Sequence, residues 1–191
     1  MAKIIAFEGL SGCGKTTVIE GVIRDLENRG IKTAVVNIKT IGDAPVLHTI
    51  ARKHPLTSRT RLLLLWTLRL QQSVAIQEMS QEFDVIIADR FWGSTMALDI
   101  YGNGVPEEIL SWVMGDILCT PDLTFFLEAP IETLRVRKDS PTLRDPYFAK
   151  RTEHGFQILA DKFSWIRVDA AQEPEKVKDE CLHEILSRLR I

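Results

Sequence analysis

The amino-acid sequence predicts an α/β fold, in which a five-stranded parallel sheet carries helices on both faces. Two observations lead to this prediction. Nearly continuous apolar runs of strand length alternate with longer segments of helical pattern, as expected for buried parallel strands joined by helical crossovers. The first apolar run is followed directly by a glycine-rich segment that opens a helix, an arrangement typical of phosphate sites at the edge of a sheet.

Five segments carry the strand pattern. Four of them are rich in Ile, Val or Phe and nearly continuous in apolar character, whereas the last is shorter and more weakly apolar. Runs of this kind are typical of parallel strands that are buried on both faces. The predicted strands are Lys3–Glu8, Lys32–Asn37, Asp84–Ala88, Leu123–Leu127 and Trp165–Val168.

Helical patterns fill the intervals between the strands. The first ends in a basic turn followed by Gly30, a common helix stop, and Pro106 and Pro174 stand where a helix tolerates proline, in its first turn. The helix that begins at Ser58 is apolar over more than one stripe, so we expect it to be buried on several sides or shared in a homodimer. The predicted helices are Lys15–Arg29, Ser58–Gln81, Pro106–Leu118, Ile131–Lys138, Tyr147–Lys162 and Pro174–Leu189.

Length and composition narrow the class of protein. A chain of 191 residues with 45% hydrophobic and 26% charged residues is typical of one globular domain, and a net charge of −2 argues against a broad nucleic-acid or anionic-membrane surface. The longest apolar run, Leu62–Trp66, is far too short to span a bilayer. The cysteines Cys13, Cys119 and Cys181 contain no CxxC pair and indicate reduced thiols. We therefore expect a single cytoplasmic domain, residues 1–191, without nucleic-acid polymers or membranes as partners.

The segment Gly9–Thr17, with the sequence GLSGCGKTT, is a complete phosphate-binding loop. Its glycines allow positive φ angles and a close approach of the backbone to an anion, while the following helix adds the partial positive charge of its N-terminus. We expect Lys15 to bind the β- and γ-phosphates of ATP, and the Thr16 hydroxyl to ligate Mg²⁺. The residues expected to hold the nucleotide are Gly9, Ser11, Gly12, Cys13, Gly14, Lys15, Thr16 and Thr17.

An Asp-Arg pair, Asp89-Arg90, follows the buried strand Val85–Ala88. In an open parallel sheet the carboxyl ends of the strands face the ligand crevice, so both side chains are expected beside the phosphate loop. Asp89 can hold Mg²⁺ through water, and Arg90 can bind an acceptor phosphate with its planar guanidinium. The alternative interpretation is a local ion pair that closes the strand.

A basic segment interrupts the alternation late in the chain. The stretch Asp139–Pro146 has two prolines and contains or is flanked by several basic residues, among them Arg135, Arg137 and Arg144. We expect a short basic lid, about residues 137–150, that closes on phosphates and excludes water from the reaction. A solvated basic loop without that role is the alternative.

These motifs together resemble the thymidylate kinase family of P-loop nucleoside monophosphate kinases, over nearly the whole chain and in the expected order. The resemblance implies the P-loop NTPase fold and the transfer of a phosphoryl group from MgATP to a nucleoside monophosphate, with dTMP as the expected acceptor and dTDP as the product. The phosphate loop alone is shared by many families, whereas the combination of motifs is much more selective. The residues that carry the resemblance are Phe7–Thr17, Asp89-Arg90-Phe91 with Ser94, Pro121–Leu127, Arg135 and Asp169–Gln172.

The resemblance also implies roles for single residues. Arg90 matches the arginine that binds the acceptor phosphate, Arg69 on the long helix matches one that contacts the base, and Arg135 matches a position that packs against adenine. Some members carry a catalytic arginine inside the phosphate loop, but this sequence has none there. We therefore expect the lid to supply it, from Arg137 or Arg144.

The half of the expected site that would recognise the base departs from the family pattern. Ser11 stands where an acidic residue usually contacts the acceptor sugar, and Leu65 stands where an aromatic residue usually stacks on thymine. Trp66 is adjacent in sequence but lies on a different face of the helix. Asp99 lies near the place where the family has Tyr-Gln-Gly after the Asp-Arg motif. The residues expected to contact the acceptor are Ser11, Leu65, Trp66, Arg69, Arg90 and Asp99.

Two other functions fit parts of the pattern. One is a P-loop kinase for a different nucleotide or for a nucleoside. A nucleoside acceptor would need a carboxylate near its hydroxyl, for which Glu8 and Asp43 are the candidates. The other is a nucleotide-dependent switch, although the sequence contains no Asn-Lys-x-Asp guanine motif. Arg90, as a phosphate ligand, favours an acceptor that is already phosphorylated.

Overall fold

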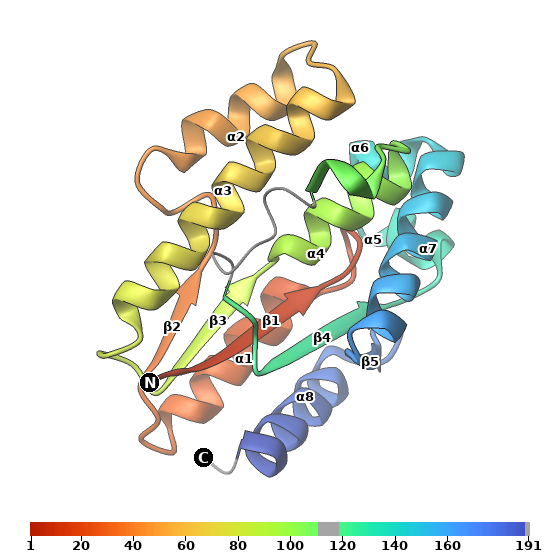
Figure 1. The fold of residues 1–191 in the computed structure, drawn as a ribbon. Coiled ribbons are helices and arrows are strands. Elements are labelled where there is room, and N and C mark those ends of the chain that lie inside the picture. The colour runs from red at the N-terminus through yellow and green to blue at the C-terminus, as the bar shows by residue number, and fades with distance from the viewer. Residues whose placement is uncertain (111–118, 190–191) are drawn as a thin grey trace.

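The computed structural model describes residues 1–110 and 119–189, and it contains a five-stranded, all-parallel sheet (Figure 1). The strand order is β2-β3-β1-β4-β5, so β1 is the central strand. The predicted class, with five parallel strands between helices, is confirmed, and each predicted strand boundary lies within one residue of the observed one. The strands are β1 Lys3–Glu8, β2 Thr33–Val36, β3 Val85–Asp89, β4 Leu123–Glu128 and β5 Ile166–Asp169.

Helices cover both faces of the sheet (Figure 1). Because parallel crossovers are right-handed, α1 lies on one face and the helices between β2 and β5 lie on the other. The last helix, α8, returns to the side of α1 and packs against it. Within the described residues, no helix is both long and apolar enough to cross a membrane. The long helices are α1 Lys15–Glu27, α3 Ser58–Met79, α7 Pro146–Lys162 and α8 Pro174–Leu189.

Shorter elements fill the connections, and several of them are not predicted by the sequence pattern. Helix α2 packs against α3, and α4 runs directly into a π-helix that packs against α7. Within the predicted helix Pro106–Leu118, the structure has a 3-10 helix over Glu107–Leu110, and residues 111–118 lie outside the described residues. The other short elements are α2 Ala44–Lys53, α4 Trp92–Thr95, the π-helix Met96–Gly102, α5 Ile131–Arg137 and α6 Pro141–Arg144.

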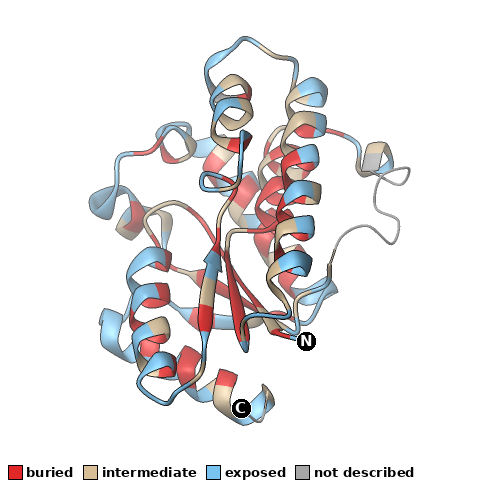
Figure 2. Ribbon diagram, turned by 90° about the vertical axis from the view of Figure 1, so that its left-hand side faces the viewer, coloured by how far each residue is buried: buried red, intermediate tan, exposed pale blue. Residues whose placement is uncertain are grey.

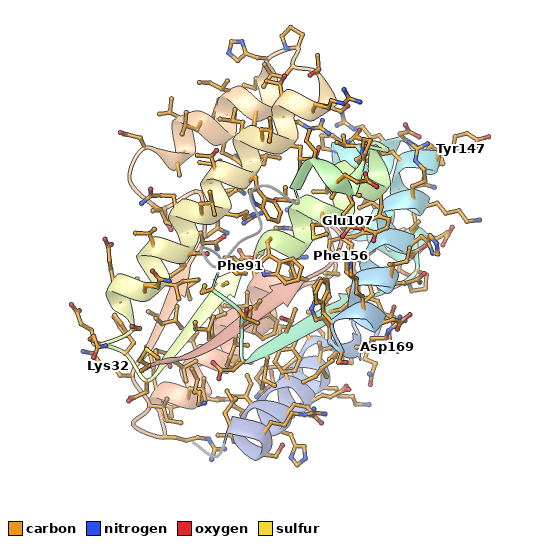
Figure 3. The ribbon with its side chains drawn as sticks, viewed as in Figure 1. Lys32, Phe91, Glu107, Tyr147, Phe156 and Asp169 are labelled. Carbon is orange, nitrogen blue, oxygen red and sulfur yellow. The ribbon has the colours of Figure 1, made fainter. Side chains whose placement is uncertain are left out.

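The hydrophobic core lies between the sheet and its two helical layers (Figure 2). The strands β1, β3 and β4 are almost wholly buried, as their continuous apolar runs predict. Phe7 of β1 stacks on Phe125 of β4 with 5.0 Å between ring centroids, and Phe126 stacks on Phe156 of α7 at 5.5 Å. Phe156 and Phe91 both point into the interior (Figure 3). This packing fixes the strand ends that carry the candidate site.

Lys178 of α8 connects that helix to α1. Its ammonium lies 2.7 Å from Asp25 Oδ2, and its stem packs over Gly21, where an added Cβ would come within 2.9 Å of the lysine Cγ. Hydrogen bonds to Asp179, Asp25 and Glu175 raise the pKa of Lys178 above its usual value. In return, the hydrogen bond from Lys178 lowers the pKa of Asp25.

The carboxyl ends of β1 and β3 lie side by side. In their parallel register Phe7 is paired with Asp89, and the backbone N–H of Arg90 donates to the Phe7 carbonyl at 3.1 Å. Glu8 and the phosphate loop therefore begin next to Asp89-Arg90, on the sheet edge where the sequence predicts that they meet.

Candidate active site

The phosphate loop connects β1 to α1 and has the backbone geometry that its glycines predict. Gly9, Gly12 and Gly14 have φ angles of 138°, 91° and 84°, a region that other residues rarely adopt. At Gly9 a Cβ would also lie 2.4 Å from the carbonyl oxygen of Leu127 in β4. The loop is therefore packed directly on the sheet, and glycine is required there for space as well as for conformation.

Lys15 lies at the centre of this loop and is 6% exposed. Its ammonium donates to the carbonyls of Gly9 at 3.0 Å and Leu10 at 2.8 Å, and it lies 2.9 Å from the sulfur of Cys13. Burial, and then the charge of Arg90, lower the pKa of Lys15. The loop thus encloses a cation where a phosphate chain would be bound. Cys13, 2% exposed, fills the space next to the Lys15 ammonium.

Asp89 and Arg90 lie beside the loop but are bound to different partners. The side-chain amide of Asn37, just after β2, donates to Asp89 Oδ2 at 2.9 Å. The Arg90 Nη1 group donates to the Gly9 carbonyl at 2.7 Å and to the Ser94 hydroxyl at 3.1 Å. The interpretation of Asp89-Arg90 as a local ion pair is therefore wrong, since each side chain is directed to another element. Asn37 is a site residue that the sequence analysis did not single out.

The carboxylate of Glu8, the last residue of β1, is buried between the phosphate loop and α4. Its Oε1 atom accepts hydrogen bonds from the backbone N–H groups of Phe91 and Ser94, each at 3.0 Å, and its Oε2 atom accepts one from the Ser94 hydroxyl. Burial raises the pKa of Glu8, against the opposing effects of Ser94, Arg69 and Arg90. Both oxygens of this carboxylate are thus used within the protein.

Arg69 of α3 is buried under the Asp89-Arg90 turn. Its Nε donates to the Thr95 hydroxyl at 3.1 Å, and its Nη1 donates to Gln72 Oε1 at 2.9 Å and to the Arg90 carbonyl at 3.1 Å. Burial lowers the pKa of Arg69 to about 10, so it stays charged at neutral pH. Gln72 also donates to the Arg90 carbonyl, at 3.0 Å. The role of Arg69 in base contact stays a prediction, but its place beside Arg90 is clear.

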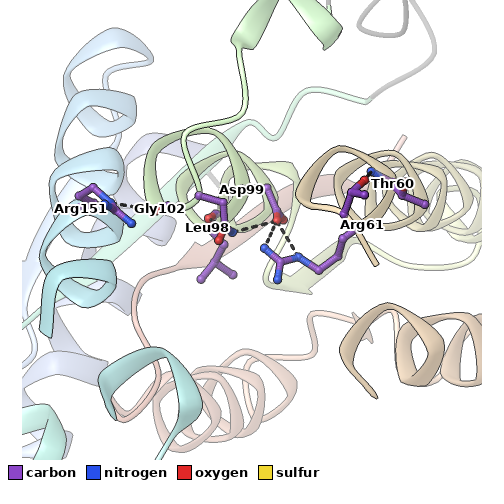
Figure 4. A network of polar contacts seen from close by, with 8 residues as sticks. Thr60, Arg61, Leu98, Asp99, Gly102 and Arg151 are labelled. Atoms are coloured by element: carbon purple, nitrogen blue, oxygen red, sulfur yellow. Dashed lines mark hydrogen bonds and ion pairs between the residues drawn. The ribbon is translucent and has the colours of Figure 1, made fainter. Parts of the chain in front are cut away.

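The buried Asp99 of the π-helix forms an ion pair with the partly exposed Arg61 of α3 (Figure 4). Arg61 Nε donates to Asp99 Oδ1 at 2.9 Å, and the Asn103 amide donates to the same oxygen at 3.2 Å. Burial raises the pKa of Asp99, although Arg61 opposes it. Arg61 and Arg69 are eight residues apart and so share a face of α3. That spacing is a signal by which the sequence could have indicated Arg61.

The other predicted acceptor residues are placed less favourably. Trp66 is 1% exposed in the core, so as placed its ring offers no face to a base. Leu65 is half-buried and packs against the small cluster of Ile38, Ala44 and Leu68 under α2. Ser11 is half-buried in the phosphate loop. Leu65 and Trp66 therefore take part in helix packing, as neighbouring positions on different faces of one helix do.

The base of the predicted lid packs directly on the phosphate loop. A Cβ at Gly12 would lie 3.0 Å from the carbonyl oxygen of Leu134 and 3.3 Å from Lys138 Cβ, at the end of α5. Arg135 donates to the Leu143 carbonyl at 3.0 Å, which connects α5 to α6. The start of the lid is therefore adjacent to the loop that would hold ATP.

The two candidate lid arginines are both bound to other groups in this conformation. Arg137 donates to the carbonyls of Ala170 and Ala171, the latter at 3.2 Å, and Arg144 forms an exposed pair with Asp139, with Nε 2.8 Å from Oδ1. The contacts of Arg144 with Asp139 and of Arg137 with Ala171 are exposed, where hydrogen bonds exchange readily with water, whereas the contact of Arg137 with Ala170 is partly buried. Which of the two arginines reaches a phosphate stays a prediction.

A parallel sheet with this strand order, a lysine enclosed in a phosphate loop and an arginine held against that loop define a P-loop nucleotide kinase. Comparison with known proteins narrows this class. A family model for thymidylate kinase matches residues 7–181, and the chain belongs to the thymidylate kinase family. The family suggested by the sequence motifs is confirmed, and with it the P-loop NTPase fold.

Individual relatives match over nearly their full lengths. The thymidylate kinase of Parasynechococcus marenigrum is 30% identical, with 98% of each chain covered. That of Acinetobacter baylyi is 31% identical over 95% of this chain and 97% of its own. That of Synechococcus sp. strain CC9605 is 31% identical over 92% of this chain and 93% of its own.

Proposed function

We propose that the protein transfers the γ-phosphoryl group of ATP to dTMP and so produces dTDP. The observation that carries this proposal is the position of Arg90, whose guanidinium lies 2.7 Å from the Gly9 carbonyl of the phosphate loop. A cation with a planar fork is thus available for an acceptor phosphate directly beside the loop for the donor phosphates. The family and its thymidylate kinase relatives support dTMP as that acceptor.

The chemistry proposed needs positioning and charge rather than a general base. A monophosphate acceptor already carries an anionic oxygen as the nucleophile, so no proton has to be removed first. Lys15 and the amide groups of the loop would bind the donor phosphates, while Arg90 would hold the acceptor phosphate in line with them. Charge that spreads over the transferring oxygens is then met by preorganised cations, which is the dominant contribution in phosphoryl transfer.

The buried position of Glu8 argues against a nucleoside as acceptor. A nucleoside hydroxyl needs a carboxylate to accept its proton, and that carboxylate must reach the hydroxyl. Both oxygens of Glu8 are engaged by Phe91 and Ser94, and its side chain is 1% exposed. The other candidate, Asp43, lies at the exposed start of α2. An acceptor that is already phosphorylated therefore fits these residues better.

The residues present fit a magnesium ion bound together with ATP. Mg²⁺ prefers oxygen ligands and is usually held by one or two protein oxygens together with phosphates and water. The Thr16 side chain is exposed in the first turn of α1, and Asn37 engages Asp89 through one carboxylate oxygen, Oδ2. We propose that Thr16 holds the ion directly and Asp89 through water. When bound, the ion would neutralise charge on the donor phosphates.

Surface features of α3 support a homodimer, which we propose as the assembled form. Leu63 is 43% exposed and Val74 is 38% exposed. The two are eleven residues apart, close to three helical turns, and therefore lie on one face. Light scattering on the purified protein should give twice the mass of one chain. A variant with lysine at both positions should give the mass of one chain. A monomeric wild type at micromolar concentration would contradict the proposal.

A coupled assay of ADP release over a panel of acceptors tests the proposed reaction. The panel contains dTMP, dUMP, dCMP, dAMP, dGMP, thymidine and a blank without acceptor. We expect the highest kcat/KM with dTMP and background rates with thymidine and with the blank. Equal release with and without acceptors would indicate a hydrolysing switch, and turnover of thymidine would indicate a nucleoside kinase.

The variant Arg90→Ala tests the assignment of the acceptor phosphate. We expect KM for dTMP to rise by roughly a hundredfold, since a charge-assisted bidentate contact is lost, while KM for ATP changes little. The matched control is Lys138→Ala, which removes a different cation at an exposed position next to the phosphate loop. An equal loss of ATP affinity in Arg90→Ala would show that this arginine serves the donor site instead.

A further inference from the structure

Glu8 occupies a position between the two phosphate sites that the proposed reaction does not itself explain. It directly precedes the phosphate loop in sequence, yet its hydrogen bonds go to the turn after β3. Oε1 accepts from the N–H groups of Phe91 and Ser94, so a single oxygen satisfies two donors at the start of α4. The carboxylate therefore holds the chain immediately after Arg90.

The Ser94 hydroxyl extends this contact to the guanidinium. It donates to Glu8 Oε2 and accepts from Arg90 Nη1 at 3.1 Å, which makes a continuous chain from the carboxylate to the arginine. The partners that touch Arg90 directly, the Ser94 hydroxyl and the Gly9 carbonyl, are neutral. Within residues 1–110 and 119–189, the positive charge of Arg90 is thus oriented without a direct ion pair and stays available to an anion.

The backbone of the turn shows that this arrangement is imposed on the chain. Arg90 has a φ of 64°, in the left-handed region that a residue with a side chain rarely adopts. Such conformations persist only where surrounding contacts hold them, and they are common at ligand sites. Gly93 closes the turn from the other side, because a Cβ there would lie 2.9 Å from Glu8 Oε1. The carboxylate therefore has little room to move away from the turn.

We propose that Glu8 is a positioning residue for the acceptor site: together with Ser94 it holds the turn after β3 so that Arg90 already lies against the phosphate loop before the acceptor binds. The proposal rests on the proposed function, because it assigns Arg90 to the acceptor phosphate. A preoriented arginine lowers the cost of ordering side chains when the acceptor binds. Removal of the Glu8–Ser94 contact should hence weaken acceptor binding more than donor binding.

Two variants test this on the intact protein, Glu8→Gln and Ser94→Ala. Glu8→Gln keeps the shape but replaces an acceptor oxygen by an amide, and Ser94→Ala keeps the carboxylate but removes the hydroxyl next to Arg90. The matched control is Asp84→Asn, at the opposite end of β3, where the carboxylate also accepts a backbone N–H, that of Lys32 at 2.8 Å. Steady-state kinetics give KM for dTMP, KM for ATP and kcat, and calorimetry gives the affinity for dTMP alone.

We expect both test variants to raise KM and Kd for dTMP about tenfold or more, while KM for ATP changes by less than about twofold. The double variant should be little worse than Glu8→Gln alone, because the two residues act through one contact. A purely structural role would lower kcat and thermal stability without this split between the two substrates, and that result would overturn the proposal. If the wild type itself does not phosphorylate dTMP, the proposed function fails; if it does and KM for dTMP is unchanged in both variants, only this inference fails.

Discussion

Replacement of Gly93 by alanine adds one methyl group to the turn after β3, the turn that positions Arg90, at a point where neighbouring atoms leave no room for it. The added Cβ would lie 2.4 Å from Cη2 of the Trp165 indole and 2.9 Å from Glu8 Oε1. Carbon atoms in contact are normally about 3.5–4.0 Å apart, so the indole has to retreat by about 1 Å or more. Trp165 is 9% exposed and packs against Trp92 and Phe163, so this movement disturbs a packed cluster.

The magnitude follows from two opposing contributions. Overpacking of a filled interior costs about 1–3 kcal/mol, whereas the change from glycine to alanine in a helix contributes up to about 1 kcal/mol in the other direction. For Gly93→Ala we therefore expect a net loss of about 1–2 kcal/mol, and in a chain of this length a fall in Tm of roughly 2–8 °C. Because the methyl group also presses on Glu8, KM for dTMP should rise more than KM for ATP.

Thermal unfolding followed by circular dichroism, together with the two KM values, measures both parts of this prediction. The comparison variant is Gly21→Ala in α1, where the added Cβ would lie 2.9 Å from Cγ of Lys178 and would contact no residue of the acceptor site. Its stability should also fall, but its KM for dTMP should stay that of the wild type. A Gly93→Ala protein with unchanged Tm and unchanged KM for dTMP would refute the reasoning, because the indole and the carboxylate would then have free space around them.

Three further predictions concern the donor site, the lid and the contact between helices α1 and α8. Lys15→Ala should lower kcat by about a hundredfold or more while circular dichroism stays unchanged, and near-normal ADP release would refute its role. One of Arg137→Ala and Arg144→Ala should lower kcat by about 10²–10³-fold with little effect on KM for dTMP; two active variants would exclude a catalytic arginine from the lid. Lys178→Met should lower the free energy of unfolding by about 1–2 kcal/mol near pH 7. Since Lys178 lowers the pKa of Asp25, this contribution is present above the ordinary aspartate pKa and is lost as pH falls through the lowered folded-state pKa, so urea titrations should show the difference shrinking below about pH 4.

The sheet and the phosphate loop could be predicted because their signals are local. Continuous apolar runs identify buried strands, and the glycine spacing identifies the loop, whatever the rest of the chain does. Helix α2 is not among the predicted helices, although its segment carries a helical pattern. Ala44, Leu47 and Ala51 recur at spacings of three and four residues; Ala44 and Ala51 are buried, and Leu47 packs against the cluster with Ile38 and Leu68. The amphipathic pattern of this short segment was therefore available in the sequence, whereas its packing partners on α3 were not.

The segment after Arg90 was missed for a different physical reason. Its first N–H groups are satisfied by Glu8, which lies 86 residues before Ser94, and it continues into a π-helix whose period differs from the usual helical one. Likewise, Asn37 reaches Asp89 across 52 residues. Buried polar contacts between distant residues can be found only once the fold has brought them together.

Neighbouring strands of a sheet lie about 4.8 Å apart. β1 and β3 stay paired as far as Phe7 and Asp89, and beyond that pair the Arg90 N–H donates to the Phe7 carbonyl at 3.1 Å. The phosphate loop and Arg90, proposed to bind ATP and the phosphate of dTMP, are hence joined by backbone pairing within one sheet, which favours a constant distance between them. Any motion needed for turnover is then expected in the segments that lie over this edge of the sheet. The paired strands beneath them keep the two substrates at a constant separation.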